Sequence, residues 1–176
     1  MEQGLIRLNL GCGHKLMPGF INVDLPGNWS GIRPDFEADI SEPLPFEDSY
    51  ADEVHAYHVL EHFHRWKVEG ILKDWMRVLK PGGKIVLEMP CFDKVLGYMF
   101  DRVQRGEQFD ARMTMWAMYG DPSYESEEMT HKWFWSMVEL TDVLEDIGFD
   151  MVAIEEPKTH IAARDMRVTA RKKMGV

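Results

Sequence analysis

The chain has 176 residues, of which 45% are hydrophobic and 28% charged, and its formal net charge is −10. These values are typical of a soluble globular protein, and we expect one domain spanning residues 1–176. The acidic balance argues against free-standing binding of nucleic acid, because neutralising phosphates requires clustered Lys and Arg side chains. No apolar run approaches the roughly 20 residues of a membrane span, and the first residues lack the pattern of a signal peptide. We therefore expect a cytoplasmic protein with no membrane association.

An apolar segment, residues 5–10, runs directly into Gly11-Cys12-Gly13. The segment is expected to form a buried strand, and two glycines one residue apart allow a sharp turn and a close approach of a ligand to the backbone. A second apolar segment, residues 20–23, ends in Asp24. Glycines after one strand and a carboxylate after the next suit a nucleoside at the carboxyl edge of a parallel sheet. A tight turn without a ligand is the alternative for the glycine pair.

The connection between these two strands is short. Only residues 14–19 separate Gly13 from the second strand, which is too few for a crossover helix. In dinucleotide-binding folds the acid lies about 20 residues after the glycines, and Asp24 is much closer. A nicotinamide oxidoreductase is therefore a remote alternative, also because Leu16 occupies the position of the third glycine.

The rest of the chain reads as alternating strands and helices. Amphipathic helices are expected over residues 65–80 and 136–147, the second opened by a capping box of Ser136 and Glu139. Apolar residues between 95 and 118 indicate one or two further helices. Further strands are expected at 35–40, 51–58, 84–89, 149–154 and 166–170. With the first two, these make seven strands and predict an α/β fold.

Several pieces of the sequence follow the order found in class I S-adenosylmethionine-dependent methyltransferases. They are residues 8–13, 22–24, 44–48, 58–62, 77–83 and 148–149. The chain resembles the small predicted methyltransferases of bacteria and phages within this class. The resemblance implies a Rossmann-like, mostly parallel seven-stranded sheet with an antiparallel last strand, helices on both faces and a shortened first crossover. It also implies a methyltransferase with S-adenosylmethionine as cofactor.

The resemblance further implies which residues contact the cofactor. The glycine pair would pass beneath its methionine part, Asp24 would hold the ribose hydroxyls, and Asp39 would accept from the adenine amine. His58 would line the cofactor and face its methyl group. For each acid, a solvated carboxylate at a strand end is the alternative. The expected cofactor-binding residues are Gly11, Cys12, Gly13, Asp24, Leu25, Asp39, Ile40 and His58.

A sulfonium cofactor already carries the activation that methyl transfer needs. The protein then has to exclude water, align a nucleophile and remove a proton from a hydroxyl. His131 is the expected catalytic residue, because the pKa of histidine lies near neutrality. A hydrogen bond to a backbone carbonyl is the alternative role for His131. The looser segment at about 92–135 is expected to be an insertion that covers the substrate. Its Met and aromatic residues from Met99 to Tyr119 either line an apolar pocket or belong to the core.

A metal is not part of this expectation, although His58-Val59-Leu60-Glu61-His62 leaves one open as an alternative. The pattern also occurs in inverted zinc peptidases, but there both histidines share a helix, whereas His58 would end a strand. Small-RNA 2′-O-methyltransferases and some quinone-pathway O-methyltransferases carry Glu-x-x-Glu-His here and use a divalent metal. The chain resembles them, with His58 in place of the first glutamate and His131 as the late histidine.

We therefore expect a methyltransferase acting at oxygen or nitrogen of a small-molecule or sugar-like acceptor. Metal-assisted O-methyl transfer is one alternative. Another is a protein that binds S-adenosylmethionine without catalysis, which the short first connection permits.

Overall fold

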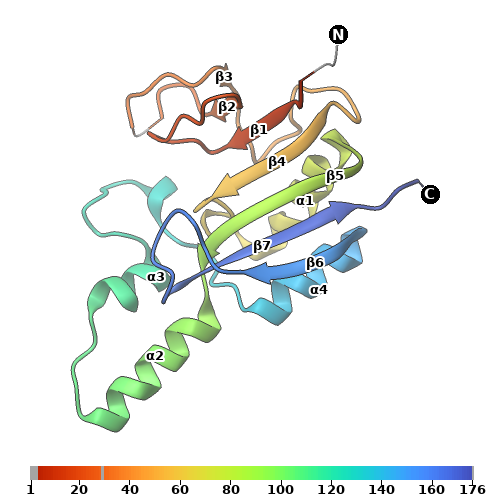
Figure 1. Cartoon of the computed structure of the whole chain (residues 1–176). Coiled ribbons are helices and arrows are strands. Elements are labelled where there is room, and N and C mark those ends of the chain that lie inside the picture. The colour runs from red at the N-terminus through yellow and green to blue at the C-terminus, as the bar shows by residue number, and fades with distance from the viewer. Residues whose placement is uncertain (1–3, 29, 176) are drawn as a thin grey trace.

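The computed structural model describes residues 4–28 and 30–175 and contains one mixed sheet (Figure 1). Its strand order is β3-β2-β1-β4-β5-β7-β6. β1 to β5 run parallel, and β7 is antiparallel to both β5 and β6. This confirms the expected Rossmann-like fold with an antiparallel last strand. The strands are β1 (Arg7–Leu10), β2 (Ile21–Asp24), β3 (Phe36–Glu37), β4 (Ala51–Tyr57), β5 (Leu79–Pro90), β6 (Phe149–Glu155) and β7 (Asp165–Lys172).

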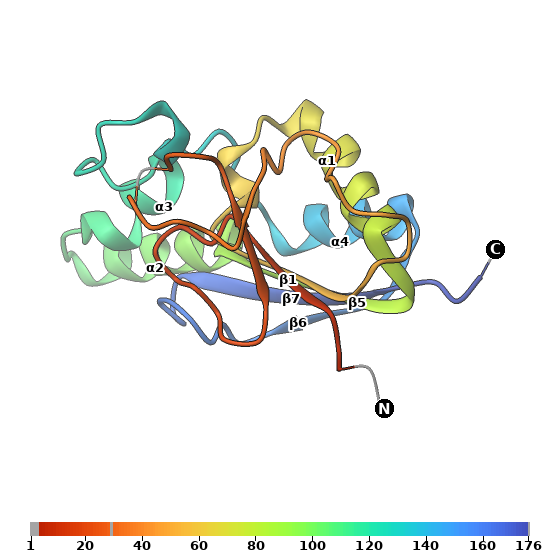
Figure 2. The ribbon, with the colours of Figure 1, turned by 90° about the horizontal axis from the view of Figure 1, so that it is seen from above.

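The helices are distributed unevenly around the sheet. We expected helices on both faces, but α1 and α4 contact each other on one face, and α2 extends beyond the carboxyl edge (Figures 1 and 2). The reason is that the described residues of the first three connections contain no helix. The helices are α1 (Arg65–Val78), α2 (Phe92–Arg105), α3 (Met115–Tyr119) and α4 (Met137–Ile147), with short 3-10 turns η1 (Leu60–His62), η2 (Ala111–Met113) and η3 (Glu127–Met129). None of the described helices is long and apolar enough to cross a membrane.

The two faces of the sheet differ in chemistry because side chains alternate along each strand. Leu8 and Leu10 of β1, with the residues paired to them in β4, belong to the apolar core beneath α1 and α4. The intervening positions on the opposite face are polar. There His55 bonds to Glu53 at 2.8 Å and to Tyr57 at 2.7 Å. These bonds satisfy buried polar groups on a face that no helix covers.

Two strand boundaries differ from the expectation. β3 contains two residues instead of six, because the Asp39 carboxylate accepts from the amide and hydroxyl of Ser41 and turns the chain. β5 begins at Leu79, before the Pro-Gly-Gly sequence, because Ala51 of β4 pairs with Leu79. α1 therefore ends at Val78, earlier than its apolar pattern suggests.

The segment after β5 leaves the sheet and returns to its starting point. Cys91 and Trp135 form a parallel bridge, and the amide of Phe92 donates to the Trp135 carbonyl at 2.8 Å. The bridge closes residues 92–134 at their base, as Figure 1 shows. These limits match those of the expected insertion, whose role in covering substrate stays a prediction.

α4 begins at Ser136, whose hydroxyl accepts from the Glu139 amide at 3.1 Å. The reciprocal half of the expected capping box is absent from the bonds of these described residues, because the Glu139 carboxylate accepts instead from Arg65 and Trp133. We expect Ser136→Ala to lower the free energy of unfolding by about 1 kcal/mol, measured by urea denaturation. Ser123→Ala, which removes an exposed hydroxyl without a capping role, is the control. Equal stabilities of both variants would contradict the capping role.

Candidate active site

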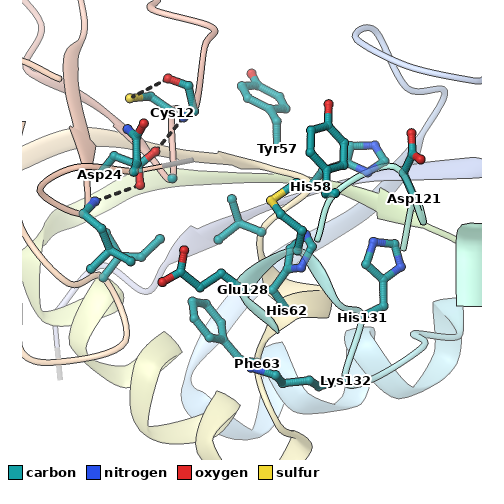
Figure 3. A pocket seen from close by; sticks show the side chains of 18 of the residues that line it. Cys12, Asp24, Tyr57, His58, His62, Phe63, Asp121, Glu128, His131 and Lys132 are labelled. Atoms are coloured by element: carbon teal, nitrogen blue, oxygen red, sulfur yellow. Dashed lines mark hydrogen bonds between the residues drawn. The ribbon is translucent and has the colours of Figure 1, made fainter. Parts of the chain in front are cut away.

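A cavity of about 710 Å³ lies at the carboxyl edge of the parallel strands (Figure 3). Its volume is in the range of small-molecule sites. The structure brings together in it every residue that the sequence pointed to. These are Gly11, Cys12, Gly13, Asp24, Leu25, Asp39, Ile40, His58 and His131.

One part of the cavity is built by the loop after β1 and the end of β2. Gly11 has φ of +65°, and a Cβ there would meet the Val59 side chain at 2.5 Å, so only glycine fits. The Asp24 carboxylate accepts from the amides of Gly13 at 2.6 Å and Leu25 at 2.8 Å. Asp24 therefore holds the loop after β1 and the start of the loop after β2 in place. Each of its oxygens retains a lone pair for a ligand.

Cys12, Asp39 and Ile40 border the same part. Burial, reinforced by the negative charge of Asp24, raises the pKa of the Cys12 thiol to about 12. Cys12 is therefore an uncharged residue of the cavity wall and does not act as a nucleophile. Asp39 is exposed, and one of its carboxylate oxygens accepts a hydrogen bond from the Ser41 amide. Ile40 is buried, and its carbonyl accepts from the Trp75 indole at 3.2 Å.

His58 follows β4 and lies between two buried carboxylates. Its Nδ1 is 3.1 Å from Glu61 Oε1, and its Nε2 is 3.3 Å from Asp165 Oδ2. Burial favours the neutral imidazole, but hydrogen bonds and charges from Asp165 and Glu61 outweigh it and raise the pKa of His58 to about 9. Against the effect of burial, the same contacts lower the pKa of both carboxyls to about 2. His58 is therefore an imidazolium near neutral pH.

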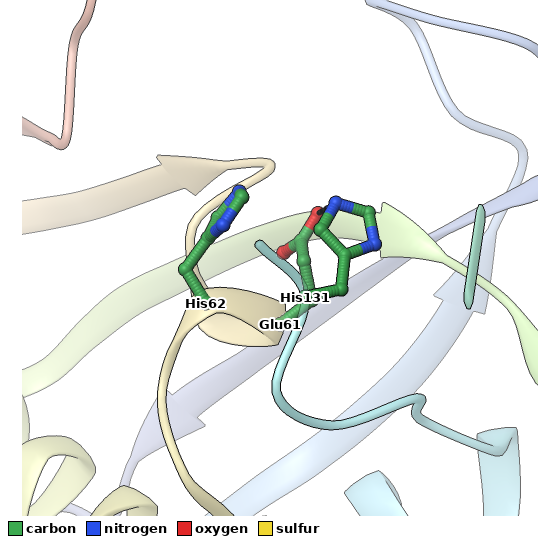
Figure 4. A group of neighbouring side chains, drawn as sticks. All are labelled: Glu61, His62 and His131. Atoms are coloured by element: carbon green, nitrogen blue, oxygen red, sulfur yellow. Dashed lines mark ion pairs between the residues drawn. The ribbon is translucent and has the colours of Figure 1, made fainter. Parts of the chain in front are cut away.

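Glu61, His62 and His131 meet beside His58 (Figure 4). One ligand atom of each lies within 4.8 Å of the others. Glu61 is only 1% exposed, and neither carboxylate oxygen has a hydrogen-bond partner apart from the ionic contact with His58. His131 Nε2 lies 4.0 Å from Glu61 Oε1.

Backbone carbonyls fix the protonation of both histidines. His131 Nδ1 is 2.8 Å from the Ala117 carbonyl, and His62 Nδ1 is 3.3 Å from the Thr130 carbonyl. A carbonyl only accepts, so each Nδ1 carries the proton and each Nε2 keeps a lone pair. Burial lowers the pKa of His62 more than the Glu61 charge raises it, which keeps this ring neutral. The expected carbonyl partner of His131 is thus present, and it leaves Nε2 free to act as a base or a ligand.

Sequence reasoning missed two residues beside His58. Asp165 is the first residue of β7. Because β7 is antiparallel to β5, its first residue lies at the edge where the parallel strands end, and this position could have indicated a site residue. His160 lies in the β6–β7 loop, with its ring centroid 3.8 Å from that of His58 and its Nε2 3.1 Å from the Lys15 ammonium. Burial, together with the charges of His58 and Lys15, lowers the pKa of His160 to about 4.

The Met and aromatic residues at 99–119 contribute less to the cavity than expected of an apolar pocket wall. Of the methionines and aromatic residues between positions 99 and 119, only Trp116 lines it. Leu96, Phe100 and Val103 of α2 are all more than half exposed. The apolar pattern of α2 therefore describes an exposed helix face and not a pocket wall.

Comparisons with known proteins agree with this geometry. A family model described as a methyltransferase domain matches residues 26–87. No curated protein sequence matches the chain. Among solved structures, a SAM-dependent methyltransferase from Methanosarcina mazei is 20% identical, with a TM-score of 0.65, and the match covers 99% of this chain and 95% of that one. One from Archaeoglobus fulgidus is 19% identical, with a TM-score of 0.63, 96% of this chain covered and 87% of that one.

Human N-acetylserotonin methyltransferase, solved in complex with S-adenosylmethionine, is 20% identical, with a TM-score of 0.62. The match covers 96% of this chain and 47% of that one. These structures share the fold with the present chain, and the family model adds the sequence match over residues 26–87. Residues 26–87 therefore match a methyltransferase domain, and the chain as a whole has the fold of the S-adenosylmethionine-dependent methyltransferases.

Proposed function

We propose that the protein transfers a methyl group to oxygen or nitrogen of a small-molecule or sugar-like acceptor. The observation that carries the proposal is that the residues expected at the cofactor and the expected catalytic histidine line one cavity. In the view of Figure 3, His58 lies between Asp24 and His131. The cofactor would occupy the part around Asp24, and the acceptor the part around His131.

The residues around Asp24 fit S-adenosylmethionine. Gly11 excludes a side chain where the loop packs, and the Asp24 carboxylate retains lone pairs for the ribose hydroxyls. Asp39 and Ile40 would flank the adenine. When bound, S-adenosylmethionine supplies a methyl group that is already activated on a sulfonium.

The chain's own task is to place the acceptor and to take its proton. His131 Nε2 has a lone pair, and the Glu61 carboxylate 4.0 Å away would stabilise the imidazolium that forms when the acceptor hydroxyl or amine loses its proton. Segment 92–134 would exclude water. Its position is held by the bond from Arg164 to the Arg112 carbonyl at 2.9 Å and by the bond from the Lys132 amide to the Glu61 carbonyl at 2.7 Å.

Metal-assisted O-methyl transfer is a second candidate, favoured by the arrangement of Glu61, His62 and His131. Two imidazole rings and one carboxylate suit zinc and similar divalent ions, and three protein ligands leave a position for the acceptor oxygen. Each histidine donates its other N–H to a carbonyl, as metal-binding histidines commonly do. The metal would then increase the acidity of the hydroxyl, in place of direct proton transfer to His131.

Asp24→Asn should weaken the binding of S-adenosylmethionine and of S-adenosylhomocysteine about 10- to 100-fold, because one charged acceptor is lost. Isothermal titration calorimetry measures this change. Asp52→Asn is the matched control, since Asp52 also accepts from a backbone amide, that of Ile6 at 2.8 Å, but does not line the cavity. Unchanged affinity of Asp24→Asn would remove Asp24 from the cofactor site.

His131→Gln should lower turnover about 100-fold or more, because the base or metal ligand is lost. Its affinity for S-adenosylhomocysteine should remain that of the native protein, which also shows that the variant is folded. Release of S-adenosylhomocysteine during an acceptor screen measures turnover. Full turnover of the variant would exclude His131, and no turnover of the native protein on any acceptor would favour cofactor binding without catalysis.

Titration with Zn²⁺ or Mn²⁺ decides between the two candidates. If the metal candidate is correct, the native protein binds one equivalent, Glu61→Gln and His62→Gln do not, and a chelator lowers turnover without changing the circular dichroism spectrum. His64→Gln, at a cavity histidine outside the group, should bind metal normally. Full turnover in chelator would leave His131 as the direct base.

A further inference from the structure

The cavity differs in charge from the rest of the molecule. The whole chain has 20 Lys and Arg residues against 30 Asp and Glu residues. The cavity reverses this balance. Its cationic residues are Lys15, Lys67, Arg112, Lys132 and Arg164, and its acidic residues are Asp24, Asp39, Asp121 and Glu128. A cavity lined by more cations than carboxylates accepts an anion more readily than the acidic remainder of the surface does.

Some of these charges are already paired. Lys15 bonds to His160, and Arg164 forms a bidentate ion pair with Asp165. Among the residues that the structure describes, Lys67, Arg112 and Lys132 have no carboxylate partner. Three cations therefore remain available to a ligand.

At the acceptor end, two acids, Asp121 and Glu128, face these three cations (Figure 3). Asp24 holds the loop amides of the proposed cofactor part, and Asp39 turns an oxygen to Ser41. Asp121 accepts from the Ser123 amide at 2.9 Å. Glu128 is exposed, as are the three cations, so the two acids leave one positive charge in excess at this end.

The three unpaired cations come from separate elements that line the cavity with His131. Lys132 follows it directly, and the Lys132 amide donates to the Glu61 carbonyl at 2.7 Å, which holds this backbone against η1. Arg112 lies over the Trp116 ring at 5.3 Å. Lys67 belongs to the first turn of α1. Figure 3 shows Lys132 next to Phe63 at the border of the cavity.

We infer that the methyl acceptor carries an anionic group, a phosphate or a carboxylate, and that Lys132, Arg112 and Lys67 bind it. This inference rests on the proposed function, because it assigns the acceptor to the part of the cavity around His131. The guanidinium of Arg112 can bind either anion through two parallel hydrogen bonds, and the lysines add positive charge. The anionic group would anchor the acceptor while its hydroxyl or amine reaches His131.

Two matched pairs of probes test the inference in the presence of saturating S-adenosylhomocysteine. Glucose 6-phosphate is compared with glucose, and 4-hydroxybenzoate with 4-hydroxybenzamide, by calorimetry. We expect the anionic member of at least one pair to bind about tenfold or more tightly than its neutral partner, and less tightly at high salt. The pair that responds tells whether the group is a phosphate or a carboxylate.

Charge-removing variants complete the test. Lys132→Gln and Arg112→Gln should each reduce the preference for the anion about fivefold or more, whereas Lys73→Gln, at an exposed lysine of α1 outside the cavity, should not. Equal binding of neutral and anionic probes, no binding of either anion at about 5 mM, or an unchanged preference in both variants would overturn the inference. Failure of the native protein to bind S-adenosylhomocysteine would instead refute the proposed function.

Discussion

The site depends on one buried ionic contact, the imidazolium of His58 between Glu61 and Asp165. It joins the end of β4 and the adjacent turn η1 to the start of β7, which lies more than 100 residues later in the sequence. His58 has φ of +55°, an unfavourable conformation for a residue with a side chain, and the two carboxylates hold it there. Removing one partner would leave an uncompensated buried charge, so the three residues form a single unit.

This contact also sets the chemistry next to it. Glu61 directs one oxygen to His58, and apart from this contact no N–H or O–H group of the described residues donates a hydrogen bond to its carboxylate. The carboxylate therefore remains a strong acceptor close to His131. The backbone of Glu61 contributes too, since its carbonyl accepts from the amides of Lys132 and Trp133. One buried glutamate thereby positions both the proposed base and the neighbouring lysine.

The polar face of the sheet helps to form the cavity at its carboxyl edge. None of the described helices covers one face of the sheet (Figures 1 and 2), and polar residues of that face, such as Glu53, His55 and Tyr57, bond to one another. Glu88 illustrates the consequence, because it pairs with Arg167 and also accepts from the amides of Lys158 and Thr159. The β6–β7 loop is thereby held against the sheet, which brings His160 to the cavity.

The sequence by itself determined the elements whose signals are local. Apolar periodicity predicted α1 and α4, and the glycine pair with Asp24 predicted the loop that borders the cavity, because side-chain spacing and backbone freedom act over a few residues. His131, chosen for its place before the capped helix and for the near-neutral pKa of histidine, also lines the cavity, and its catalytic role stays a prediction.

Tertiary structure alone decided the contacts between distant segments. No local pattern shows that Asp165 and His160 come to lie beside His58, since strand order places β7 next to β5. Nor does local pattern show that the apolar face of α2 stays exposed, or that one sheet face lacks helices, because burial depends on what packs against an element and not on its own periodicity.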